Sequence, residues 1–212
     1  TEYVTGLDLV EEQIKIASGE ELSFNQDDVK LEGWAIESRI YAEDPSRGFL
    51  PSTGRITEYI EPKKGKNVRI DSGVYAGGEV SMFYDAMIAK LITYGKDRIE
   101  AIDRQQKALG EYFINGISHN VSFLEAIMEH ERFRDGNLST KFIDEEYPSG
   151  FSGADLNEEK YQAMLGVGLF VYLQDAFRAS KISGQLPGRP RRIPNRLVVS
   201  VDENKFSVSY EV

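Results

Sequence analysis

Residues 33–45 read GWAIESRIYAEDP, and this stretch decides the fold class. Apolar and polar side chains alternate along it, and successive side chains of a β-strand point to opposite faces. The alternation predicts a strand at 34–41 with one face in a core and one polar face flanked by aromatic rings. The first face holds Trp34, Ile36, Ser38 and Ile40, and the second holds Glu37, Arg39 and Tyr41.

The surrounding sequence predicts further strands and several helices. Short alternating runs broken by Pro and Gly fill residues 33–95 and are typical of an antiparallel or mixed sheet. We expect the additional strands at 55–60, 68–71 and 87–94. Helices are expected where an acidic cap precedes an apolar stripe, at 8–19 and 97–113, and a further short helix is expected from Asn120 to Ile127. The stripe of the first helix indicates that it lies on a larger body. The fold class is therefore α+β, with helices packed on the sheet.

The C-terminal third has a different character. An acidic run ending in turn formers, DEEYPSG at 144–150, marks a domain boundary, so we divide the chain into a domain at 1–145, a linker at 146–156 and a partial domain at 157–212. A helix apolar on most sides is expected at 155–179 and a hairpin at 197–212. A lone hairpin is marginally stable, so we expect further strands to cover it. The basic stretch at 178–196 is interpreted as a solvated connector; a nucleic-acid or phosphate patch is the alternative.

Composition excludes several classes of protein. The 212 residues carry 35 acidic and 25 basic side chains, a formal charge of −10, which argues against a duplex-DNA binder. The absence of Cys excludes disulfide scaffolds, thiol catalysis and Cys-based zinc sites, and two His leave little for a metal centre. No stretch predicts a membrane span or a signal peptide. The chain starts at Thr1 without Met, so we expect it to be cut from a longer one.

Several motifs in one order resemble the biotin carboxylases. They lie at 1–19, 33–54, 68–73 and 84–92, and the resemblance covers roughly residues 1–145, the C-terminal domain of those enzymes. Further stretches are similar to the alpha subunits of propionyl-CoA carboxylases: 94–98, 116–120, 139–142 and 147–151. Residues 157–212 look like the start of that subgroup's subunit-docking (BT) domain, a long helix leading into a β-barrel that is truncated here.

The resemblance implies a reaction, cofactors and partners. Relatives use Mg-ATP to activate bicarbonate and then carboxylate biotin. Their ATP-grasp half lies before the position of Thr1 and their biotinylated segment beyond that of Val212, so we expect this fragment alone to be inactive. The implied partners are the rest of the biotin carboxylase subunit, the biotin carboxyl carrier domain, the carboxyltransferase beta subunit and a second copy in a homodimer, with no nucleic acid and no membrane. The implied compartment is a bacterial cytoplasm or the mitochondrial matrix.

The resemblance also assigns roles to particular residues. Arg39 matches the arginine that stabilises the oxyanion formed when the biotin ring loses a proton; a strand arginine paired with Glu37 or Glu43 is the alternative. Glu37 could orient Arg39, or form an ordinary surface pair with it. Asp85 matches a residue near the biotin pocket, or is a turn former. Arg69 matches a position at the dimer contact, or is an ordinary surface arginine. No metal ligand is predicted.

Other residues are expected to be structural. They are Tyr84, as core; His119, beside a helix cap at Asn120; and His130, as a solvated side chain. Gln105 and Gln106 stand where relatives often have Met, so we expect that helix face to be less buried. Ser38 stands where many relatives have Cys, a small-for-small change.

Two other hypotheses stay open. Residues 1–145 could act as a non-catalytic scaffold and dimerisation module. The chain could also belong to the biotin carboxylase of an acetyl-CoA, methylcrotonyl-CoA or pyruvate carboxylase, because the partner that selects the acyl acceptor is not part of it.

Overall fold

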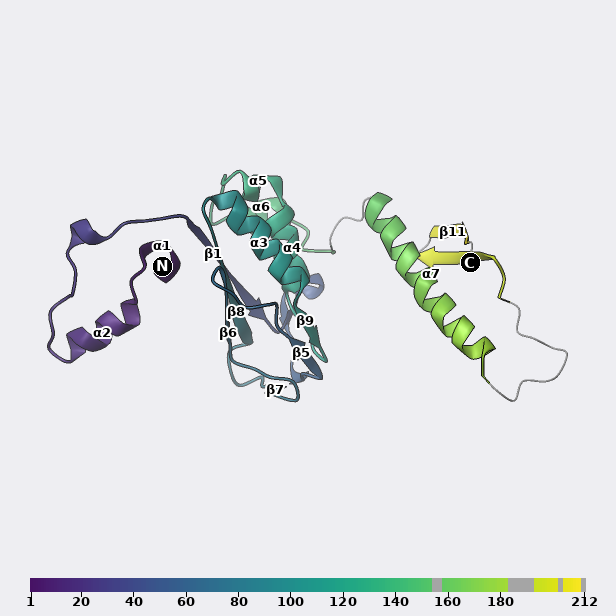
Figure 1. Cartoon of the computed structure of the whole chain (residues 1–212), viewed down its shortest axis with the longest axis horizontal. Coiled ribbons are helices and arrows are strands. Elements are labelled where there is room, and N and C mark those ends of the chain that lie inside the picture. Colours follow the sequence, from purple (N-terminus) through teal and green to yellow (C-terminus); the bar gives the residue numbers. More distant parts are fainter. Residues whose placement is uncertain (154–157, 183–192, 202–203, 211–212) are drawn as a thin grey trace. The chain divides into compact units, whose positions relative to one another are not determined.

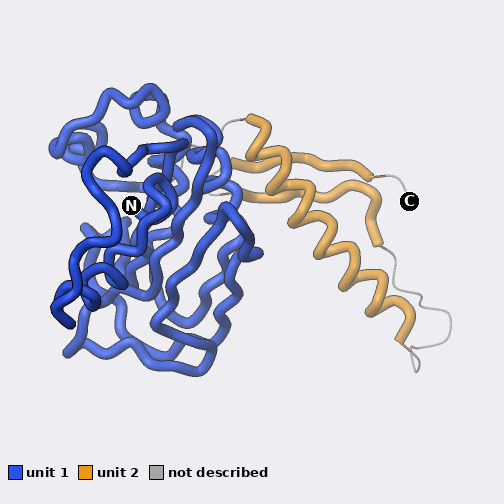
Figure 2. Tube along the Cα trace, turned by 60° about the vertical axis from the view of Figure 1, so that its left-hand side comes forward, with its two compact units in different colours: residues 1–154 blue, residues 155–212 orange. Residues whose placement is uncertain are grey.

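The chain forms two compact units, Thr1–Ala154 and Asp155–Val212 (Figure 2). The computed structural model describes residues 1–153, 158–182, 193–201 and 204–210. The expected α+β class is confirmed, because the first unit combines small antiparallel sheets with packed helices.

A three-stranded antiparallel sheet lies at the centre of the first unit (Figure 1). Its strands are β1 (Trp34–Tyr41), β8 (Met87–Gly95) and β6 (Val68–Ser72), in the order β1-β8-β6. These are the strands predicted at 34–41, 87–94 and 68–71. The predicted core face of β1 is found for Ile36, Ser38 and Ile40, which are buried, whereas Trp34 at the start of the strand is 44% exposed and the prediction is wrong there. A β-bulge interrupts the β1–β8 register between Ile40 and Tyr41.

Three two-stranded ladders extend this framework. They are β2 (Glu43–Asp44) with β3 (Leu50–Pro51), β4 (Gly54–Arg55) with β7 (Glu79–Val80), and β5 (Glu58–Ile60) with β9 (Phe113–Asn115). The prediction of one strand at 55–60 is therefore wrong, because its two halves pair with different partners. Gly116 sits at a φ of +99°, and a Cβ there would lie 2.3 Å from the carbonyl oxygen of Arg55, so this crossing requires glycine.

Helices cover one face of the central sheet. Figure 1 shows α3 (Arg98–Gly110) and α4 (Val121–Glu129) side by side, followed by α5 (Glu131–Arg134) and α6 (Phe142–Glu146). Asp97 caps α3 by accepting a hydrogen bond from the N–H of Glu100, as its sequence predicts. The core between sheet and helices is apolar and includes Ile40, Ile88, Leu91, Ile102, Leu109 and Phe123.

The face of α3 that carries Gln105 is not less buried, contrary to prediction. Gln105 and Thr93 both have 0% exposure. Thr93 Oγ1 lies 2.8 Å from Gln105 Oε1, and Gln105 Nε2 donates to the carbonyl of Leu91 at 3.2 Å. A buried amide is tolerated here because partners on β8 satisfy it.

The segment after α6 also belongs to this core. Phe151 is 6% exposed, and its ring lies 5.2 Å from that of Phe123 and 5.9 Å from that of Tyr147. The linker expected at 146–156 thus includes side chains packed on the first unit, and the division into units falls at Ala154. The acidic and turn-forming residues of this segment predict a solvated linker, and the contacts of Phe151 with Phe123 and Tyr147 depend on the fold.

The N-terminal segment carries α1 (Glu2–Thr5), α2 (Leu9–Ala17) and the short 3₁₀ turn η1 (Gln26–Asp28), while a second turn, η2, spans Pro45–Arg47. Asp8 caps α2 by accepting from the N–H groups of Val10 and Glu11. The apolar stripe of α2 was expected to lie on a larger body, yet Leu9, Val10 and Ile14 are 44%, 64% and 63% exposed. Periodicity predicts which face is apolar and says nothing about which part of a protein covers it.

The second unit packs one long helix on a hairpin. The helix α7 (Glu158–Ser180) contacts β10 (Arg196–Val201), which pairs with β11 (Asn204–Ser209). The rings of Tyr161 and Phe206 lie 6.2 Å apart. The expected helix cap at Asp155, much of the basic stretch at 178–196 and the hairpin turn at 202–203 lie outside the described residues. In the described part of the chain, no helix is long and apolar enough to cross a membrane.

Candidate functional site

Arg39 lies on the polar face of β1, beside Glu37. Arg39 Nε donates to Glu37 Oε1 at 3.2 Å, and the two side chains are 58% and 42% exposed. The hydrogen bond with Glu37, followed by one with Tyr41, raises the pKa of Arg39 above its ordinary value. The period of the strand places these three side chains on one face, so the predicted grouping is confirmed and the guanidinium stays charged.

Lys90 joins this face from the neighbouring strand, and the sequence reasoning missed it. It lies directly opposite Arg39 in the β1–β8 register, and Asp71 of β6 lies opposite Lys90 on its other side. Directly paired residues of adjacent strands project to the same face, so Arg39, Lys90 and Asp71 form one charged row across the sheet. The available signal was that Lys90 is the single charged residue of the strand sequence MIAKLITYG.

A hollow of about 220 Å³ opens on this face. Side chains of the central sheet line it together with the start of the chain, among them Glu37, Arg69, Asp71, Lys90 and Ile92, with Thr1, Glu2 and Tyr3. The sheet thus brings Glu37 and Arg69, which are 32 positions apart in the sequence, to one surface depression. Its lining mixes both signs of charge.

Arg69 is held by two carboxylates. Its Nε donates to Asp71 Oδ1 at 2.9 Å and its Nη1 to Glu2 Oε2 at 2.5 Å, and these bonds raise the pKa of Arg69, with Asp71 the larger contributor. The side chain is 47% exposed. In this structure Arg69 ties α1 to β6, as the interpretation of an ordinary surface arginine expects. Exposed pairs of this kind contribute at most about 1 kcal/mol.

Asp85 precedes the first residue of β8 by two positions, in an exposed segment. Its Oδ1 accepts from the N–H of Met87 at 3.0 Å, which is the bond expected of a turn former. Burial, and then the charge of Asp85, raise the pKa of the neighbouring Glu43. The prediction that Tyr84 belongs to the core is wrong, because Tyr84 and Phe83 are 86% and 88% exposed. Aromatic character favours burial, but residues 81–85 are exposed, and burial begins only at Ala86, which packs against the core.

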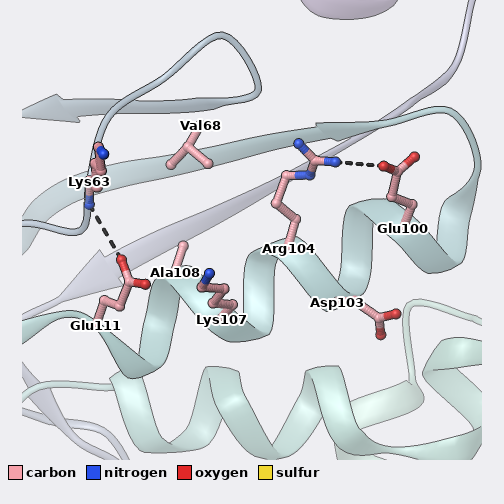
Figure 3. A pocket seen from close by; sticks show the side chains of 8 residues that line it. All are labelled: Lys63, Val68, Glu100, Asp103, Arg104, Lys107, Ala108 and Glu111. Atoms are coloured by element: carbon pink, nitrogen blue, oxygen red, sulfur yellow. Dashed lines mark hydrogen bonds and ion pairs between the residues drawn. The ribbon is translucent and has the colours of Figure 1, made fainter.

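A second hollow, of about 490 Å³, runs along α3 (Figure 3). Its lining alternates basic and acidic side chains, and the acidic ones are already engaged. Glu100 bonds to Arg104 at 2.6 Å, Asp103 to Arg134 at 2.7 Å, and Glu111 accepts from the N–H of Lys63 at 3.4 Å. Pairing of this kind is typical of a solvated helix face. Arg39 and Glu37, to which the resemblance assigns roles, lie on the β1 face, so that face remains the candidate site.

The two histidines differ in their surroundings. His130 Nε2 lies 3.1 Å from Glu146 Oε2, with its ring against Phe142, so the expectation of a solvated side chain is wrong. Burial lowers the pKa of His119, which bonds to the carbonyl of Ile114. Among the described residues, no three acidic or histidine side chains come together in a group that could hold a metal ion.

The sheet with its packed helices and its arginine-bearing polar face has the architecture of a biotin carboxylase C-terminal domain. The sequence matches the family "Biotin carboxylase C-terminal domain" over residues 37–145, about half of the chain, and the chain belongs to this family.

Curated relatives extend the match beyond that domain. The propionyl-CoA carboxylase alpha chain of Ruegeria pomeroyi is 43% identical over 99% of this chain and 34% of its own length. The mitochondrial one of Mus musculus is 44% identical over 100% of this chain and 28% of its own length. Biotin carboxylase 1 of Bacillus subtilis is 54% identical over 68% of this chain and 32% of its own length. The chain therefore spans about a third or less of the relatives it matches.

Solved structures agree on the fold. The biotin carboxylase domain dimer of Hydrogenobacter thermophilus 2-oxoglutarate carboxylase, in complex with MgADP, ADP and bicarbonate, is 41% identical with a TM-score of 0.68. The match covers 73% of this chain and 34% of the chain in that structure. The biotin carboxylase subunit of a pyruvate carboxylase is 45% identical with a TM-score of 0.67, over 70% of this chain and 32% of that one.

Proposed function

We propose that this chain is part of the biotin carboxylase subunit of an acyl-CoA carboxylase of the propionyl-CoA type. The whole protein would carboxylate biotin with ATP and bicarbonate, and this chain would supply one wall of the biotin site. The observation that carries the proposal is Arg39, a permanently charged guanidinium held by Glu37 on the open polar face of β1, in a member of this family.

The donor set of this face suits the ureido group of biotin. Biotin supplies a ring nitrogen that accepts the carboxyl group, and the ureido oxygen gains negative charge when that nitrogen loses its proton. Arg39 would donate hydrogen bonds to this oxygen, and Glu37 would hold the guanidinium in place through Nε. A fixed cation stabilises such an oxygen most strongly where the charge develops, so its effect falls on the transition state. Asp85, as part of the same pocket, remains a proposal resting on the family resemblance.

The test is a substitution in the whole protein that carries this chain. Arg39→Ala should lower kcat/KM for biotin by about a hundredfold, as loss of an oxyanion donor does, while the KM for ATP stays within about twofold. Bicarbonate-dependent ATP cleavage with free biotin is the assay, and Lys66→Ala, at an exposed lysine off the polar face, is the control. Equal loss for ATP and biotin in a folded variant would contradict the role of Arg39.

ATP, Mg²⁺ and bicarbonate are assigned mainly to parts of the whole protein outside residues 1–212. The support is that a relative described as a complex with MgADP and bicarbonate is matched over only 34% of its length. The 212-residue chain alone is then expected to be inactive. Turnover by the purified chain would overturn this part of the proposal.

The propionyl-CoA type is proposed from the extent of the matches. Two propionyl-CoA carboxylase alpha chains align over 99% and 100% of this chain, whereas the Bacillus subtilis biotin carboxylase aligns over 68%. The partial subunit-docking domain proposed at 157–212 supplies the difference, and its proposed partners are a biotin carboxyl carrier domain and a carboxyltransferase beta subunit. Carboxylation of propionyl-CoA, acetyl-CoA, methylcrotonyl-CoA and pyruvate by the assembled enzyme would identify the acceptor. Bacterial and mitochondrial relatives support a bacterial cytoplasm or a mitochondrial matrix as the compartment.

A homodimer is the second proposal, favoured because one matched structure is described as a domain dimer. Arg69 is its candidate contact, although the residue also ties Glu2 to Asp71 within the chain. Analytical ultracentrifugation of the chain and of Arg69→Glu tests the proposal. The proposal is supported if the wild-type chain is a dimer and the Arg69→Glu variant is a monomer. The same molecular mass for both chains in solution would contradict the role of Arg69.

A further inference from the structure

Asn120, directly before α4, is hydrogen-bonded to the backbone of Arg39 and of Tyr41 on β1. Its Nδ2 donates to the carbonyl of Arg39 at 3.1 Å, and its Oδ1 accepts from the N–H of Tyr41 at 2.9 Å. The backbone N–H of Asn120 also donates to the carbonyl of Tyr41 at 3.2 Å. Three hydrogen bonds thus join two positions that are about 80 residues apart in the sequence.

These bonds replace the role that the sequence predicts for Asn120. It occupies the N-cap position of α4, where an Asn side chain normally accepts from the first free N–H groups of the helix, yet it makes no such bond. A side-chain cap stabilises a helix by about 1 kcal/mol, which is forgone here. The side chain is turned to β1 instead and is buried, with Asn120 6% exposed.

The contact falls on the edge strand of the sheet, because β1 is the outer strand in the order β1-β8-β6. Arg39 pairs with Lys90 and Ile40 with Ala89, and the register shifts before Tyr41, which pairs with Met87. Arg39 and Tyr41 are two residues apart, so their backbone groups point to the same side of the strand. Asn120 binds the Arg39 carbonyl and the Tyr41 N–H on that side, and this fixes the backbone from which the Arg39 side chain projects.

We propose that Asn120 is a positioning residue for Arg39, acting through the backbone of β1 rather than by touching biotin. This inference rests on the proposed function of Arg39. Glu37 holds the guanidinium end of Arg39, and Asn120 holds its backbone end. A donor that stabilises developing charge must be held in place beforehand, so a loosened backbone reduces its effect.

The experiment is a double-mutant cycle on biotin kinetics in the whole protein. Asn120→Ala should lower kcat/KM for biotin by about tenfold, corresponding to about 1.4 kcal/mol, and leave the KM for ATP within about twofold. In the Arg39→Ala background the same substitution should have almost no further effect, because Asn120 acts through Arg39. Equal losses in both backgrounds, or no loss in the wild-type background, would overturn the inference.

Two further variants keep the result interpretable. Asn120→Asp retains the size and the acceptor for Tyr41 N–H but removes the donor to the Arg39 carbonyl, so it should reproduce the loss if Asn120→Ala does not fold. Gln105→Met removes another buried amide from the same layer and should leave kcat/KM for biotin within about twofold. A neutral Arg39→Ala would overturn the proposed function together with this inference. A strongly impaired Arg39→Ala combined with a neutral or additive Asn120→Asp would overturn the inference alone.

Discussion

Thr93 and Gln105 form a buried polar pair whose stability contribution can be measured directly. Thr93 Oγ1 lies 2.8 Å from Gln105 Oε1 and 2.9 Å from the carbonyl oxygen of Ala101, so one hydroxyl proton serves two acceptors. Replacing Thr93 by Val keeps the shape of the side chain and removes that donor. The amide oxygen of Gln105, with 0% exposure, then has lost its hydroxyl donor and cannot turn to water.

The expected cost follows from this geometry. A buried acceptor that loses its donor destabilises a fold by about 1–3 kcal/mol, whereas replacing both partners by apolar groups of similar shape is nearly neutral. Thr93→Val should therefore lower the free energy of unfolding by about 2 kcal/mol, and Thr93→Val combined with Gln105→Met should recover at least about half of that loss. The single Gln105→Met leaves Thr93 able to donate to Ala101, so its cost should be smaller.

Urea unfolding followed by Trp fluorescence is the assay. Trp34 is the single tryptophan of the chain and lies at the start of β1, so the signal reports on the first unit alone. Midpoints and slopes are compared for the wild type, both single variants and the double variant. A double variant less stable than Thr93→Val would refute the reasoning, because it would show that the polar pair is not a coupled, satisfied unit.

Two further predictions concern burial in the same unit. Burial lowers the pKa of His119 below its unfolded value, so the fold favours the neutral ring. The stability contributed by His119 should be full above about pH 6.5 and should fall as the pH drops below that value. His119→Gln should flatten this pH dependence in urea titrations between about pH 7 and 5. A free energy of unfolding that depends on pH as steeply in His119→Gln as in the wild type would contradict this prediction. Phe151→Ala should cost about 3 kcal/mol by removing the ring packed on Phe123, whereas the exposed control Phe83→Ala should stay within about 0.5 kcal/mol. Similar costs for both would place Phe151 outside the core.

The sequence predicted the features that depend on residues close together in the chain. The two faces of β1 follow from the period of a strand, and Asp8 and Asp97 cap their helices because an acidic side chain there reaches free N–H groups. These interactions lie within a few residues of one another, so the sequence contains them directly. The pairing of Arg39 with Glu37 belongs to the same class, since they are two residues apart on one face.

Contacts between distant segments were not predictable in the same way. The expected strand at 55–60 is apolar and alternating enough, but its division into β4 and β5 depends on β7 and β9, which lie 20 to 60 residues further on. Gln105 shows the same limit for burial. A polar residue on a helix predicts exposure until its partner on β8 is known, and that partner comes from the fold.

The candidate site combines both kinds of information, and this explains which of its members the sequence revealed. Arg39 and Glu37 are given by the period of one strand, whereas Lys90 and Asp71 join them only through the antiparallel register of β1, β8 and β6. Arg39 and Lys90 are like charges in directly opposed positions, which destabilises a sheet unless an anion lies close. Asp71, opposite Lys90 on its other side, provides one such charge, and Glu37 provides another at Arg39. Glu37 lies along β1 from Arg39, and the carboxylate of Asp71 also bonds to Arg69, so Arg39 and Lys90 remain adjacent cations on this face. In the proposed function, this pair of cations would suit a face that stabilises an oxygen bearing developing negative charge.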